Sequence, residues 1–147
     1  MNQSHNGLKA YGRATQTVNK TRQVVMLYDG AIRFLQHASE AIEKKDYETR
    51  YNKLVRVSDI LIGLQSCLDF DAGGASAKIL FDFYSAMDTR VFALHRSNDI
   101  QACQAIIREL KEMRDAWDQI DRASELSTNG AAKPADNNAT DSSTVSA

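Results

Sequence analysis

The sequence predicts an all-α protein, an antiparallel four-helix bundle, on the basis of three observations. Residues 21–126 contain no proline, and their apolar residues recur at spacings of three and four, the periodicity of an amphipathic helix. No stretch of four or more residues alternates cleanly between apolar and polar, as a half-buried strand would. The connections between the predicted helices are short, so sequence neighbours must pack side by side.

The first helix is predicted over residues 22–44, and the second begins after Asp46 and runs to about Phe70. Asp46 is a suitable N-cap because its carboxylate can accept hydrogen bonds from the free amides of the first turn. The apolar face expected for the first helix comprises Val24, Leu27, Ala31, Leu35, Ala38 and Ile42. The stripe expected for the second helix comprises Tyr47, Tyr51, Leu54, Ser58, Leu61 and Leu68.

A turn at Gly73 and Gly74 is predicted to open the third helix, which breaks at Ser97 and Asn98. Asn98, with Gln101 three residues later, has the pattern of a capping box and is predicted to start the fourth helix. The face of the third helix is Leu80, Tyr84, Met87, Val91 and Leu94. The face of the fourth helix is Cys103, Ile106, Ile107, Leu110, Met113, Trp117 and Ile120.

The two ends of the chain differ from the bundle, which is assigned to residues 22–126. Residues 1–21 are predicted to form a mobile basic arm, partly ordered against the bundle through Leu8 and Tyr11, because the first 22 residues carry no acidic residue. Residues 127–147 contain one Val and no Leu, Ile, Met or aromatic residue. They cannot bury a core, so a disordered tail is expected.

Composition and charge exclude several classes of protein. The 147 residues carry 18 Lys and Arg against 19 Asp and Glu, which leaves no broad positive field for nucleic-acid binding. No apolar run approaches the roughly 20 residues of a membrane-spanning helix, and the first 20 residues lack the apolar block of a signal peptide. A cytoplasmic protein is expected, with Cys67 and Cys103 reduced and buried.

The sequence lacks the motifs of catalysis, metal binding and nucleotide binding, so neither an enzyme nor a cofactor is expected. None of the three histidines, His5, His37 and His95, completes the Glu-x-x-His motif of a di-iron bundle. No glycine-rich loop carries the Lys-Ser/Thr pair of a phosphate cradle. One alternative is a phosphotransfer bundle that uses His37 or His95, although both fit a surface or helix-end position better. The helix dipole would favour the protonated form of His95.

The second and third predicted helices have more apolar residues than one buried stripe requires. The surplus residues are Val55, Val57, Ile60, Ile62, Ile79, Phe81, Phe83 and Phe92. Either both helices are central in the fold and bury a wide face, or some of these residues line an exposed groove for another polypeptide. Val55, Ile62, Phe81 and Phe92 are the candidates for the lining of such a groove.

Five blocks in this order and spacing resemble the FliS family of flagellin export chaperones. They are Gly7–Tyr11, Met26–Gly30, Leu68-Asp69 with Gly73-Gly74, the run from Tyr84, Met87 and Arg90 to Asn98-Asp99, and Asp115–Trp117. The resemblance covers about three quarters of the chain. It departs from the family pattern at residues 19–22, which lack a Ser/Thr-Pro, and at Thr89-Arg90, where the family has paired arginines.

The resemblance implies a non-enzymatic cytosolic chaperone. Its bundle would hold the disordered C-terminal segment of flagellin, block premature polymerisation and present the subunit to a component of the flagellar export gate. The family's N-terminal segment covers part of the groove until the client displaces it, and Leu8 and Tyr11 would take that role here. An adaptor for other flagellar proteins is a further alternative, and an exposed groove is compatible with a monomer or a weak homodimer.

Overall fold

The computed structural model of the protein describes residues 20–131 and confirms the all-α, four-helix prediction. The helices are α2 (Lys20–Glu43), α3 (Tyr47–Ser66), α4 (Phe70–Ser97) and α5 (Ile100–Ala131), joined by connections of two or three residues. No strand occurs in this described range. The predicted N-terminal arm and most of the predicted tail lie outside it.

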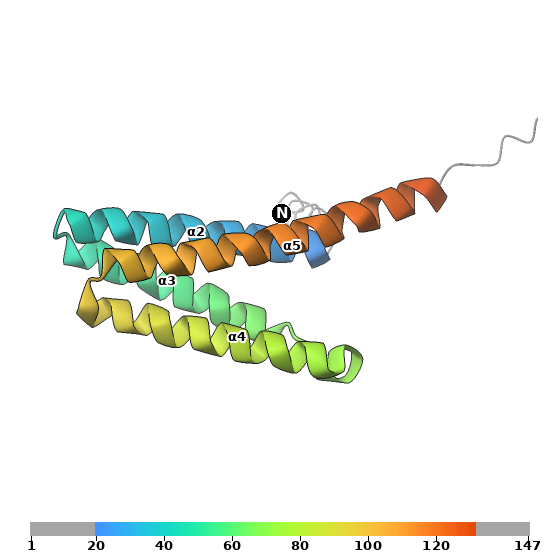
Figure 1. Ribbon diagram of the computed structural model, residues 1–147, viewed down its shortest axis with the longest axis horizontal. Helices are drawn as coiled ribbons and strands as arrows, with labels where there is room; N and C mark the ends of the chain where they lie inside the picture. The colour runs from blue at the N-terminus through green and yellow to red at the C-terminus, as the bar shows by residue number, and fades with distance from the viewer. Residues whose placement is uncertain (1–19, 132–147) are drawn as a thin grey trace, which may run out of the picture.

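The four helices run antiparallel along one long axis (Figure 1). Helix α2 packs against both α3 and α5, and α3 packs against α4, whereas the contact between α4 and α5 is much smaller. Figure 1 shows α4 and α5 diverging with distance from the connection between them. Helix α4 therefore lies at the edge of the bundle and has only one well-packed neighbour among the described helices.

The core runs along the centre of the bundle, and a pair of tyrosines lies within it. The Tyr28 hydroxyl of α2 donates a hydrogen bond of 2.9 Å to the Tyr84 hydroxyl of α4, across two helices that otherwise make little contact. Burial raises the pKa of both phenols, so both stay protonated. The fully buried aliphatic residues around this pair include Leu35, Leu54, Leu61, Val91, Leu94, Ile106 and Leu110.

Helix caps explain where α3 and α4 begin. Asp46 is the N-cap of α3, as predicted, and its carboxylate accepts from the Thr49 amide at 3.2 Å. The next turn, however, lies at residues 67–69 rather than at Gly73 and Gly74. The Asp69 carboxylate accepts from the amides of residues 71 and 72, so α4 starts at Phe70, three residues before the predicted glycine turn. Gly74 instead forms a kink inside α4, at φ +51°.

The predicted capping box at Asn98 is wrong. Asn98 adopts a left-handed conformation and ends α4, and its side-chain oxygen accepts from Arg50 of α3. Asp99 caps α5 instead, because its carboxylate accepts from the Ala102 amide at 3.1 Å. Helix α5 then continues to Ala131, five residues past residue 126, the predicted end of the bundle.

The predicted stripe of α3 is also partly wrong. Val57, assigned to the surplus, is fully buried, whereas Tyr47 and Tyr51, assigned to the stripe, are exposed. The stripes predicted for α2, α4 and α5 mostly hold, but Ile120 at the far end of α5 is exposed. Cys103 is buried as predicted, and burial raises its pKa to about 11. Cys67, also predicted to be buried, is exposed because it lies at the end of α3, beyond the packed stripe.

Candidate functional site

Helix α4 carries exposed apolar side chains on both sides of its buried stripe. The stripe consists of Ala77, Tyr84, Met87, Val91 and Leu94. On the side toward α3, Phe81 and Phe92 are 40% and 69% exposed, and on the side toward α5, Ile79 is 68% exposed. A helix at the edge of a bundle has no neighbour to cover these flanks, which leaves apolar surface facing solvent on both sides.

One end of the furrow between α3 and α4 forms a pocket of about 470 Å³. Its apolar lining comes from Tyr51 and Val55 of α3 and from Phe92 of α4. The His95 ring lies between two aromatic rings, with centroids 5.4 Å from Tyr51 and 5.9 Å from Phe92. The pocket is therefore an aromatic and aliphatic hollow that can accept an apolar side chain.

The electrostatics of this pocket keep His95 neutral. Burial lowers the pKa of His95, and the nearby guanidinium of Arg50 lowers it further. This corrects the expectation that the helix dipole would favour the protonated ring, because desolvation and the Arg50 charge both disfavour it. Arg50 itself is fixed by its hydrogen bond to Asn98 and by its contact with the Tyr47 ring, 4.9 Å from the guanidinium carbon.

Further along the same pair of helices, Phe70 and Phe81 of α4 are exposed, and so is Ile62 of α3, one turn before Gln65. The Phe70 and Phe81 rings are in contact, with centroids 5.9 Å apart, and both are substantially exposed. Gln65, one turn after Ile62, donates to the Phe81 carbonyl at 3.1 Å and to the Ser85 hydroxyl at 2.6 Å. These bonds tie the two helices together beneath the exposed side chains. We call the pocket and these exposed side chains together the α3–α4 surface.

The structure brings the four predicted groove residues within the described range to this one surface. Ile62, Phe81 and Phe92 are exposed, at 52% in the case of Ile62, and Val55 is half-buried in the pocket wall. The other two candidates, Leu8 and Tyr11, lie outside the described residues. Sequence reasoning missed Tyr51, Phe70 and His95 as members of the surface.

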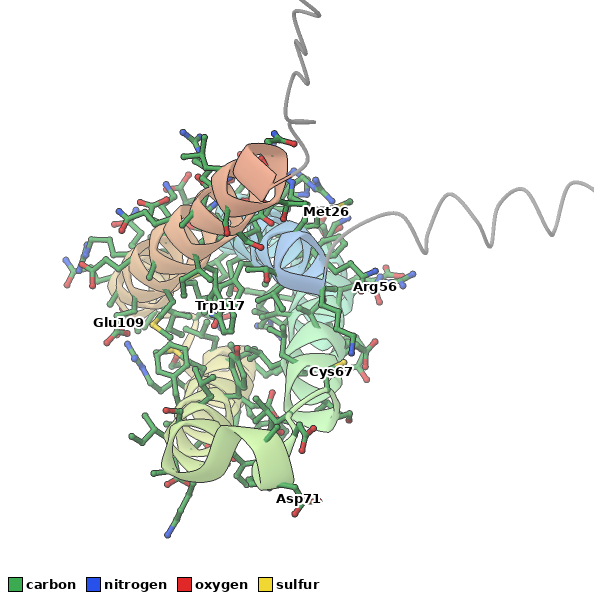
Figure 2. All side chains as sticks on the ribbon, turned by 90° about the vertical axis from the view of Figure 1, so that its right-hand side faces the viewer. Met26, Arg56, Cys67, Asp71, Glu109 and Trp117 are labelled. Atoms are coloured by element: carbon green, nitrogen blue, oxygen red, sulfur yellow. The ribbon has the colours of Figure 1, made fainter. Side chains whose placement is uncertain are left out.

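A second apolar pocket, of about 320 Å³, lies between α4 and α5. Its apolar lining comes from Ile79 and Leu80 of α4 and from Met113, Trp117 and Ile120 of α5. Figure 2 shows Trp117 extending from α5 into the space between the helices. The three α5 residues have the helical spacing expected of buried residues, so the sequence did not indicate that they are partly or fully exposed. The one sequence signal was Ile79, which lay outside the α4 stripe.

The chemistry of these surfaces is that of contact with a polypeptide. Within residues 20–131, no group of three or more His, Cys, Asp or Glu side chains could hold a metal ion. The same range contains no helix that is both long and apolar enough to cross a membrane. What it does contain is contiguous apolar surface of the kind that marks protein–protein contact.

The protein is thus a four-helix bundle whose edge helix, α4, carries exposed apolar side chains on both flanks. The model of the family described as flagellar protein FliS matches residues 4–124, and the chain belongs to this family.

Relatives with the name flagellar secretion chaperone FliS are similar over most of their own lengths. The Vibrio cholerae protein is 34% identical over 97 residues, which covers 66% of this chain and 71% of the relative. The Salmonella typhimurium protein is 30% identical over 120 residues, covering 78% and 89%. The Bacillus subtilis protein is 26% identical over 107 residues, covering 72% and 78%.

Proposed function

We propose that this protein is a cytoplasmic flagellar secretion chaperone that binds the disordered C-terminal segment of flagellin. In this role it prevents premature polymerisation and presents the subunit to a component of the flagellar export gate. It acts by binding, not by catalysis, and needs no cofactor. Membership of the FliS family and the names of the matched relatives support the chaperone role.

The observation that carries the proposal is the exposed apolar surface on both flanks of α4. A disordered client spends roughly 2–5 kcal/mol or more on becoming ordered, so it needs a broad apolar surface to leave net affinity. A pocket on each flank of α4, together with the exposed aromatic and aliphatic side chains beside it, supplies apolar surface for such a client. Val55, Ile62, Phe81 and Phe92 are the residues we assign to client contact.

The N-terminal residues Leu8 and Tyr11 are assigned a competing role. They are apolar anchors in a basic segment next to the bundle in sequence, and we place them on part of the client surface in the absence of client. The client would displace them on binding. This competition would protect the apolar surface from unspecific association.

Calorimetric titration with the C-terminal segment of flagellin from the same organism tests the function. We expect binding near one-to-one with a large negative heat-capacity change, because apolar surface is buried and the segment orders on binding. A flagellin that lacks the segment serves as the control and should not bind. If neither the segment nor the truncated flagellin binds, flagellin is not the client.

Substitutions on the α3–α4 surface test the assigned residues. Ile62→Asp and Phe92→Asp should each weaken flagellin binding by about tenfold or more, since each places a charge against an apolar client. Leu126→Asp is the matched control, because Leu126 is 74% exposed but lies near the far end of α5. All three variants should keep the helical melt of the parent protein. Unchanged affinity in Ile62→Asp and Phe92→Asp would show that the client binds elsewhere.

A further inference from the structure

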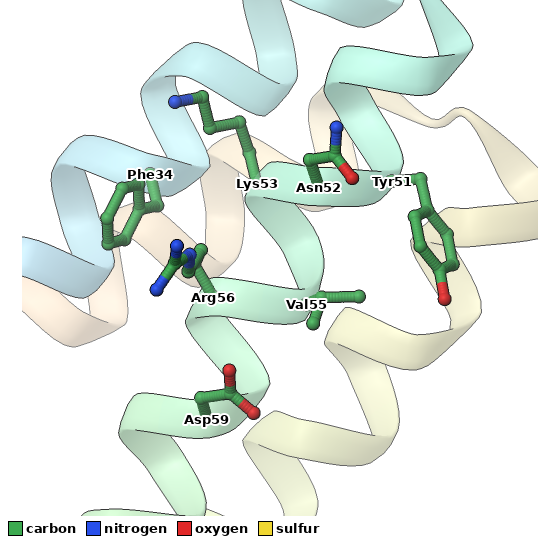
Figure 3. A pocket seen from close by; sticks show the side chains of 7 residues that line it. All are labelled: Phe34, Tyr51, Asn52, Lys53, Val55, Arg56 and Asp59. Atoms are coloured by element: carbon green, nitrogen blue, oxygen red, sulfur yellow. The ribbon is translucent and has the colours of Figure 1, made fainter.

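A third pocket, of about 740 Å³, lies between α2 and α3 and differs in character from the two apolar ones. Figure 3 shows its lining, with Phe34 on α2 and the remaining side chains on α3. Lys53 and Arg56 lie on the side of α3 that faces Phe34, whereas Tyr51 and Val55 lie on the side toward α4. The pocket thus adjoins the α3–α4 surface on α3 and shares the lining residues Tyr51, Val55 and Asp59 with it.

Cationic side chains from two helices converge on one aromatic ring in this pocket. The Arg33 guanidinium carbon is 5.6 Å from the centroid of the Phe34 ring, and the Lys53 ammonium is 5.5 Å from the same centroid. The pocket lining itself holds two cations, Lys53 and Arg56, against the single carboxylate of Asp59, and Arg33 lies beside the pocket on the Phe34 ring. The Phe34 ring is neutral and leaves this positive charge in place, and a cation–π contact at an exposed site contributes only about 0.5–1 kcal/mol.

The three cations also lack the carboxylate partners that four arginines of the bundle have. None of Arg33, Lys53 and Arg56 forms an ion pair with a residue in the described part of the chain. By contrast, Arg114 of α5 lies 2.9 Å from Asp29, and other arginines of α2, α4 and α5 also have acidic partners. Positive charge is therefore left uncompensated at the Phe34 pocket.

We propose that the Phe34 pocket binds an acidic segment of a partner protein, separate from the client on the α3–α4 surface. Glutamate or aspartate side chains would pair with Lys53, Arg56 and Arg33, and an apolar side chain of the segment would contact the Phe34 ring. A compact anion such as phosphate fits less well, because the pocket is wide and Asp59 lies on its rim. An extended acidic chain can pass Asp59 while reaching all three cations.

The position of the pocket has a consequence for how the chaperone works. Since Lys53 and Arg56 face away from α4, an acidic segment can occupy the Phe34 pocket while an apolar client occupies the α3–α4 surface. Tyr51 and Val55 line both pockets and form the ridge between the two ligands. The chain can then hold two polypeptides at once, one by apolar contact and one by charge.

A labelled peptide of twelve Glu and Asp residues with one central Leu tests the proposal on the full chain by fluorescence anisotropy. We expect saturable binding that weakens as salt rises, because exposed charges are screened over about 8–10 Å at physiological ionic strength. The isosteric peptide, in which Gln and Asn replace the acids, should not bind. Inorganic phosphate at millimolar concentration should not compete beyond its effect on ionic strength.

Charge-reversal variants locate the site. Arg56→Glu should weaken binding of the acidic peptide by about tenfold or more, whereas the matched variant Arg108→Glu, at an exposed position of α5, should change it less than about twofold. Phe92→Asp should leave acidic-peptide binding intact even where flagellin binding is lost, so the two proposals fail separately. Equal losses in Arg56→Glu and Arg108→Glu, equal binding of the neutral peptide, or competition by phosphate would each overturn the acidic-segment site.

Discussion

At the scale of single residues, His95 shows how the α3–α4 surface controls ionisation. Its ring is packed between Tyr51 and Phe92, and the Arg50 charge lies on the α3 side of the same pocket. The carboxylates of Asp59 on α3 and Asp88 on α4 also line the pocket. Burial and the guanidinium together hold the pKa of His95 below its ordinary value of 6.5, so the ring is neutral at physiological pH.

This lowered pKa makes the stability of the bundle depend on pH. The unfolded chain binds a proton at His95 more readily than the folded chain does, so the contribution of the neutral ring is fully present above pH 6.5 and is lost as the pH falls below it. Urea unfolding at pH 7.5 and pH 5.0 should therefore show a smaller decrease in the free energy of unfolding for His95→Gln than for the parent.

Other titrating groups also contribute to the decrease in the free energy of unfolding between pH 7.5 and pH 5.0. A matched histidine variant controls for their contribution. The matched variant is His37→Gln, which alters a histidine of α2 that does not line the His95 pocket. The same decrease in His95→Gln as in the parent would show that His95 is not the responsible group.

At the scale of helices, α3 and α4 illustrate two different uses of glycine. A Cβ added to Gly63 of α3 would meet no atom within 4 Å, so nothing in the packing requires a glycine there. Gly74 of α4 has φ +51°, a conformation that a residue with a Cβ adopts only at a cost. The first glycine therefore weakens its helix, and the second permits the kink in the first turns of α4.

Substitution by alanine should separate these two positions. Gly63→Ala should raise the free energy of unfolding by about 0.5–1 kcal/mol, because alanine is favoured in a helix interior and restricts the unfolded chain. Gly74→Ala should lower it by about 1–3 kcal/mol, because the backbone there (φ +51°, ψ −126°) lies in a region that residues with a Cβ rarely adopt. Urea denaturation monitored by circular dichroism measures both, and a destabilised Gly63→Ala would reveal packing at that position that the structure does not show.

At the scale of the whole molecule, the placement of α4 at the edge of the bundle creates the candidate client surface. Helix α2 is covered by α3 on one side and α5 on the other, while α4 has close packing only with α3. An edge helix with a narrow buried stripe leaves its flanking apolar residues open to a partner. A partner helix or extended segment on either flank would complete the packing that α5 does not supply.

Deletion of residues 1–17 tests whether the N-terminal segment competes for this surface. If Leu8 and Tyr11 occupy part of the client site in the free protein, the deletion should increase the affinity for the flagellin segment, because client no longer has to displace them. Calorimetric titration of both forms gives the ratio of affinities. An unchanged or weaker affinity after deletion would argue against a displaceable segment.

Part of the client site could be predicted from the sequence, and part could not. The surplus of apolar residues in the second and third predicted helices indicated an extra apolar face, and Ile62, Phe81 and Phe92 do lie exposed on it. The same reasoning placed Val57 with the surplus and Tyr51 with the core, and both positions are reversed in the structure. A buried stripe and an exposed stripe on the same helix have the same apolar spacing in the sequence. Only the positions of the neighbouring helices show which of the two is buried.

The sequence by itself determined the all-helical fold, the buried stripe of α4, the cap at Asp46 and the family, because these depend on local periodicity, local hydrogen bonding and residue order. Only the tertiary structure decided which apolar flank faces solvent, which way the pKa of His95 shifts, and where cations from α2 and α3 meet at Phe34. Each of these depends on side chains that are distant in sequence, and their proximity is set by how the helices pack.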